Sequence, residues 1–175
     1  SAASDVYKRQ DRNFRKNQHN NFNQDRGGKP RYMTFTDFIA HKDLGQKTML
    51  FLIDGLYGSE NVNGAPSGKW KMPPFNNNWP CSLFASQDPV AIDAVGIDFL
   101  SSEFPRMADV DYCDMYLVEA AMADLPLSNT FYDPERDGTG VKSLGVLEHW
   151  NNPIEKKYSR NQGKDIGIEL IYLHK

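Results

Sequence analysis

The stretch CSLFASQDPVAIDAVGIDFLSSEF, residues 81–104, decides the fold class of this sequence. Its first six residues are apolar enough for a short strand. Asp88 and Pro89 then provide an N-cap and a first helical residue. Apolar residues cover almost the whole circumference of the helix that we expect to run from there to about Phe104. That pattern is typical of a buried helix, so the stretch predicts a strand followed by a core helix.

A second strand is expected upstream, at Lys47–Asp54 (KTMLFLID). Its apolar run is continuous rather than alternating, which predicts a strand buried on both faces. Before it, Thr36 is placed to cap a short helix over Asp37–Leu44, and Gly45 is placed to end that helix. The two strands would then be joined by a long loop rich in Gly, Pro and Asn.

The downstream half predicts a helix over residues 112–124, an irregular stretch to residue 143, and a closing strand at Ile166–Leu173 (IGIELIYL). Strands and helices thus alternate without an internal repeat. We expect an α/β or α+β fold in which a mixed sheet packs against buried helices, with long irregular loops between them.

Bulk composition fits one globular domain: 39% of the residues are hydrophobic and 25% are charged. A formal net charge of −3 gives no general attraction to nucleic acid. No apolar run approaches the roughly 18 residues that a membrane span needs. Cys81 and Cys113 are the only cysteines, too few for an iron–sulfur cluster, which normally takes four. They leave open either one disulfide or two buried free thiols.

Residues 1–29 differ from the rest of the chain. Ser1–Gln10 (SAASDVYKRQ) resembles a non-native leader found on metagenomic reading frames, and we exclude it from the fold. Residues 11–29 are rich in Asn, Gln, Arg and Lys. They predict a disordered or truncated segment rather than a basic arm for nucleic acid. The folded domain is therefore expected over residues 30–175.

Carboxylates at two predicted element positions are candidate catalytic groups. Asp54 ends the first strand, at the sheet edge where α/β proteins place their ligands. Asp93 falls inside an apolar sector of the core helix, where a carboxylate must be paired, protonated or bound to a cation. If the two converge, they could hold a divalent cation or share acid and base roles. The alternatives are a turn for Asp54 and a core pairing for Asp93. Asp98 makes a weaker version of the same case.

The motif DPERDGT, residues 133–139, resembles the first half of a calcium-binding loop. It has acidic residues at positions one, three and five and glycine at position six. Position three is Glu instead of Asp or Asn, and position twelve is Leu144 instead of Glu. An ordinary Asp-Gly turn is therefore the alternative. The predicted ligands are Asp133, Glu135, Asp137 and Thr139.

Three segments together resemble the domain of unknown function 362 family: FLIDGLYG (51–58), FASQDPVAIDAVGIDFL (84–100) and SLGVLEHWNNPIEKKYSRN (143–161). The resemblance covers about residues 30–175 and the C-terminal portion of the family. It implies an exported or periplasmic bacterial protein. Some members carry ferredoxin-like cysteine motifs, but this chain does not, so no iron–sulfur cluster is expected in it.

Two functions follow as hypotheses, and the sequence leaves open whether the protein is an enzyme. The first is a divalent-cation-dependent enzyme that uses Asp54 and Asp93 on an unidentified small-molecule or polymeric ligand. The second is a non-catalytic, calcium-stabilised binding or scaffold module in which the loop at 133–139 is structural.

Overall fold

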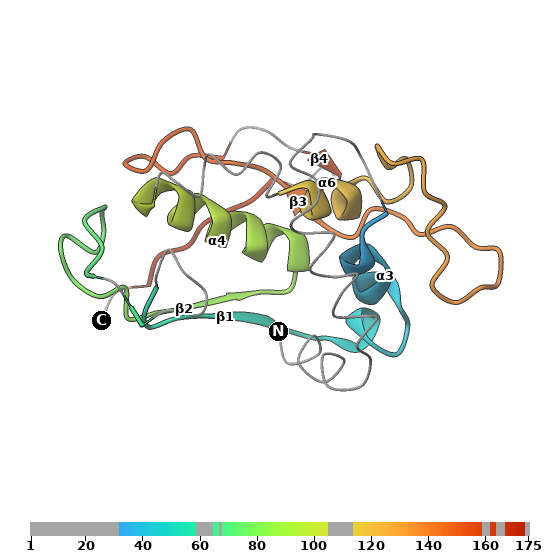
Figure 1. Ribbon diagram of the computed structural model, residues 1–175, viewed down its shortest axis with the longest axis horizontal. Coiled ribbons are helices and arrows are strands. Elements are labelled where there is room, and N and C mark those ends of the chain that lie inside the picture. Colours follow the sequence, from blue (N-terminus) through green and yellow to red (C-terminus); the bar gives the residue numbers. More distant parts are fainter. Residues whose placement is uncertain are drawn as a thin grey trace.

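The computed structural model describes residues 32–58, 65–66, 68–104, 114–158, 162–163 and 167–173. The expectations for residues 1–29 and for Cys113 lie outside these ranges. The described residues form helices together with small antiparallel sheets, which confirms a mixed α and β fold class (Figure 1). The strand pairs that they contain are all antiparallel, whereas the sequence predicted a mixed sheet.

Helix α4, Pro89–Glu103, is the centre of the fold. Its predicted cap is confirmed: Asp88 Oδ1 accepts hydrogen bonds from the backbone N–H groups of Val90 and Ala91, each at 2.9 Å. The helix is also buried as predicted, and Val90 and Ala94 are completely inaccessible. It contacts both strands of the larger sheet and helix α6, so α4 fixes the relative positions of the surrounding elements (Figure 1).

Strands β1 (Phe51–Gly55) and β2 (Ser82–Ser86) form one antiparallel pair under α4. Ile53 faces the helix so closely that a Cβ at Gly96 would lie 3.1 Å from its Cδ1 atom. The prediction that the first strand is buried on both faces is wrong. Leu52 is 53% exposed and Leu83 is 69% exposed on the outer face. An apolar run signals hydrophobicity but not whether a second layer covers the sheet.

Helix α3 spans Thr34–Ala40 and a 3₁₀ turn, η1, spans Gly45–Lys47. The predicted boundaries are wrong here. Met33 is the N-cap, and Thr36 lies buried inside the helix instead of capping it. Gly45 packs against the last turn of α3, where a Cβ would lie 2.1 Å from Ile39 O. Close packing explains this glycine, which was expected to end the helix.

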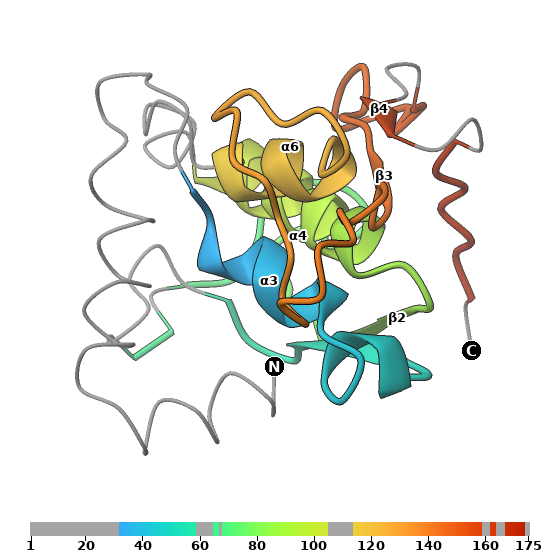
Figure 2. The same cartoon turned by 90° about the vertical axis from the view of Figure 1, so that its right-hand side faces the viewer.

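Helix α6, Met115–Ala121, is shorter than the predicted helix at 112–124, whose first two residues lie outside the described ranges. It is followed by the small antiparallel pair β3 (Val146–Leu147) and β4 (Gln162–Gly163). Residues 167–173 were expected to form a closing strand. They join no ladder among the described residues, although Figure 2 shows them as a drawn-out segment at the side of the molecule.

The core has two parts, and α4 contributes to both. On one side, Val90 and Ala94 pack against α6 through Leu117 and Ala120. The other side of α4 packs against an aromatic cluster from the loop before β2. The buried residues on this side are Trp70, Met72 and Phe75 of the loop and Val95 and Phe99 of α4. Trp70 of the long loop is thus a core residue. None of the described helices is long and apolar enough to cross a bilayer.

Candidate functional site

Asp54 lies on the outer face of β1 and is exposed. Its Oδ1 atom accepts a hydrogen bond from the N–H of Leu56 at 3.0 Å, which is the local turn interaction typical of Asp. Because side chains alternate along a strand and Ile53 faces α4, the carboxylate of Asp54 points away from that helix.

Asp93 lies on α4 and is directed toward α6. The hydroxyl of Tyr116 donates to its Oδ2 atom at 3.3 Å, and burial raises the pKa of this carboxyl. The structure therefore places the two candidate catalytic residues on different sides of β1 and gives each its own protein partner. It does not bring Asp54 and Asp93 together into one site.

His149 lies between two carboxylates, an arrangement that the sequence patterns did not reveal. Its Nδ1 atom is 2.7 Å from Asp98 Oδ1, and its Nε2 atom is 3.2 Å from Asp114 Oδ2. Asp98 also accepts from the N–H of Trp150 at 3.1 Å. The hydrogen bonds that the imidazole of His149 donates to Asp114 and, second, to Asp98 raise the pKa of His149 to about 9. A charged imidazole whose two nitrogens are both hydrogen-bonded is a poor general base. We therefore interpret His149, Asp98 and Asp114 as a structural clamp, in which the imidazole holds the two carboxylates together.

Glu119 is a second buried acid, and it is completely inaccessible. It accepts from the backbone N–H of Ser128 at 2.8 Å, from the Ser128 hydroxyl at 2.6 Å and from the Tyr132 hydroxyl at 2.8 Å. The Tyr132 oxygen in turn accepts from the N–H of Met33 at 2.9 Å. This network joins α6 to α3 and to the loop after α6. Each polar group of the network has a partner, which suits a structural role.

The loop 133–139 is organised by its own carboxylates. Asp133 accepts from the N–H of Asp137 at 3.2 Å and from that of Gly138 at 2.9 Å. Asp137 accepts from the N–H of Thr139 at 2.9 Å, an interaction that lowers the pKa of the Asp137 carboxyl. Gly138 has a φ of 83°, in the region that favours glycine.

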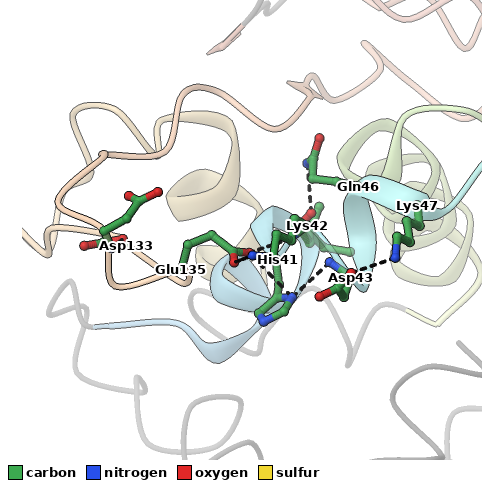
Figure 3. Close-up of polar contacts among 9 residues, drawn as sticks. His41, Lys42, Asp43, Gln46, Lys47, Asp133 and Glu135 are labelled. Carbon is green, nitrogen blue, oxygen red and sulfur yellow. Dashed lines mark hydrogen bonds and ion pairs between the residues drawn. The ribbon is translucent and has the colours of Figure 1, made fainter.

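Glu135 points out of this loop toward the end of α3 (Figure 3). Its carboxylate accepts from the backbone N–H of Lys42 at 2.8 Å and lies 3.0 Å from the Lys42 ammonium. The backbone hydrogen bond is the main reason that the pKa of Glu135 is lowered. The four predicted ligands thus do not converge on one point. Within the described ranges, no group of three His, Cys, Asp or Glu side chains is arranged to hold a metal.

A groove of about 1040 Å³ lies between β2, the first turns of α4 and residues 167–173. Apolar side chains from α4 form its floor. Within the described part of the chain, the charged residues that line it are Asp88 and Glu169, both acidic. Cys81 lies at one end as an exposed free thiol, so the expectation of a buried thiol is wrong for this residue. The sequence offered no pattern for this groove, because its walls are separated by about eighty residues of chain.

Comparisons of the chain with protein-family models, with curated proteins and with solved structures gave no match.

Proposed function

We propose that this protein is a non-catalytic binding module whose ligand occupies the groove between β2, α4 and residues 167–173. The groove carries the proposal. Its volume of about 1040 Å³ is at the upper end of the range for ligand sites, and its floor is apolar with polar groups at the rim. This proposal favours the second of the two sequence hypotheses.

The arrangement of the acids supports the same choice. The enzyme hypothesis needs Asp54 and Asp93 in one site, and they lie on different sides of β1. His149 has both ring nitrogens engaged by carboxylates. Each of these groups has a structural partner, whereas the groove has unfilled volume.

A calcium-stabilised loop is a second part of the proposal, with one observation in its favour. Asp133 at position one accepts from the backbone at positions five and six, and Gly138 at position six has the conformation that only glycine adopts easily. Binding would require Glu135 to leave Lys42 or a water to replace it. Membership of the domain of unknown function 362 family and export from a bacterial cell also stay proposals. Both rest on the sequence resemblance.

A neutral apolar dye, Nile red, tests the groove. We expect its fluorescence to rise on binding the wild-type protein and this rise to be lost in Ala91→Trp, because Ala91 lines the groove and the larger ring would fill it. Leu125→Trp is the matched control, since Leu125 is exposed and does not line the groove. Equal dye binding by Ala91→Trp and the wild type would refute the proposed site.

A further inference from the structure

One wall of the groove is the outer edge of a sheet. Among the described residues β2 pairs with β1 alone, in register from Phe51↔Ser86 to Gly55↔Ser82. In an edge strand, alternate residues direct their N–H and C=O groups away from the paired neighbour. On β2 that direction leads into the groove, because the residues from Ser82 to Ser86 all line it.

The opposite wall has the form of a strand without a ladder. From Gly167 to Leu170 the side chains alternate between exposed and half-buried, which is the two-residue period of β structure. Ile168 and Leu170 face inward and pack against the core. The N–H of Ile168 is anchored on Glu148 Oε2 at 2.7 Å. The segment is thus held in an extended form by its side chains rather than by a paired strand (Figure 2).

The length of the groove fits one strand between these walls. β2 has five residues and the opposite wall seven, so the walls are about 17 to 24 Å long at 3.4 Å per residue. This is the usual length of a strand in a globular protein.

The lining indicates which side chains such a strand would carry. One face would lie on Ala91, Ile92 and Val95 of α4, so alternate residues should be apolar. Among the described residues that line the groove, the charged ones are Asp88 and Glu169, and Asp88 already caps α4. The exposed Glu169 therefore favours a Lys or Arg at the edge of the occupant.

We propose that the groove binds an extended, basic-flanked polypeptide segment of a partner protein, which adds a strand between β2 and residues 167–173. This inference rests on the proposed function and specifies its ligand class. Backbone hydrogen bonds to the walls would provide binding that tolerates many sequences, and the apolar floor would select side chains at alternate positions.

The test uses the full chain and a synthetic peptide of about seven residues, in which Val alternates with Thr and Lys stands at each end. Binding is measured by calorimetry, by displacement of Nile red and by backbone hydrogen exchange. We expect exchange to slow at least tenfold at both 82–86 and 167–173. The same peptide with N-methyl groups on alternate backbone nitrogens should bind at least tenfold more weakly, because it lacks one row of donors.

A charge exchange tests the orientation of side chains at the rim. Glu169→Lys should weaken binding of the Lys-flanked peptide a few-fold and strengthen binding of a Glu-flanked peptide by a similar factor. Glu155→Lys is the matched control, since this exposed acid does not line the groove. A general structural defect would weaken the binding of both peptides alike. Equal losses of affinity for the two peptides would therefore overturn the assignment of Glu169.

The outcomes separate this inference from the proposed function. If Nile red binds the groove but the peptide neither displaces it nor protects the two walls, the strand inference falls and the binding module stands. If neither binds, both fall. Equal affinity for the N-methylated peptide would overturn strand addition. Protection that grows with protein concentration without any peptide would assign the groove to a second copy of this chain and overturn the partner peptide.

Discussion

The clamp at His149 predicts a specific dependence of stability on pH. The pKa of His149 is raised from 6.5 to about 9 in the folded protein by its contacts with Asp114 and Asp98. A raised pKa means that the folded state binds the proton more tightly than the unfolded state does. The resulting stabilisation is complete below pH 6.5 and is lost as the pH rises through about 9.

The size of the effect follows from the shift. At 1.36 kcal/mol per pKa unit, a change from 6.5 to about 9 corresponds to about 3.4 kcal/mol at most. The His149 side chain is 32% exposed, so solvent screening reduces this to about 2 kcal/mol. The free energy of unfolding should therefore fall by about 2 kcal/mol more between pH 6 and pH 10 in the wild type than in His149→Gln.

Urea unfolding followed by tryptophan fluorescence over this pH range measures the difference. Trp150 packs on Phe99 beside the clamp, so its emission reports the relevant region. His41→Gln is the control for loss of an imidazole, because His41 contacts neither Asp98 nor Asp114. If the wild type and His149→Gln lose stability in parallel as the pH rises, the reasoning about the clamp is wrong.

Three further predictions concern the buried acid and the loop. Glu119→Gln should lower the free energy of unfolding by about 2–3 kcal/mol in urea titration, because a carboxyl group that accepts three hydrogen bonds is replaced in a completely buried site. Calcium at a hundred times its dissociation constant should add about 2.7 kcal/mol to the free energy of unfolding, measured as a rise in melting temperature. This rise should be lost in Asp133→Asn and kept in Asp54→Asn. An unchanged melting temperature would contradict the calcium loop. Gly138→Ala should cost about 1–2 kcal/mol in the same melting assay because of its φ of 83°, whereas Gly68→Ala, with open space around it, should cost little.

Features encoded by neighbouring residues were predictable from the sequence. The cap at Asp88, the burial of α4 and the approximate position of β2 follow from spacings within a few residues, and all three are confirmed. The start of α3 was missed because Met33 carries no capping side chain. Its N–H is instead bound by Tyr132, 99 residues away, which no local pattern reveals.

Features formed by distant segments were not predictable. Asp98 looked like a weaker candidate than Asp93 on the helical wheel, yet it is the more buried of the two. Its partner His149 is 51 residues away, and Asp114 is 35 residues from that histidine. The same holds for the outer face of β1 and for residues 167–173, whose environment depends on which elements pack beside them and not on their own hydrophobicity.

The exposed outer face of the β1–β2 pair places Asp54 where it can affect association between molecules. Leu52 and Leu56 are each at least half exposed on either side of it. Short apolar strands with an open edge are seeds for aggregation, and a charge within them acts as a gatekeeper. Asp54 lies between these two leucines and places a charge in an otherwise apolar row. Its consequence is colloidal: the charge would oppose edge-to-edge pairing between separate molecules in concentrated solution.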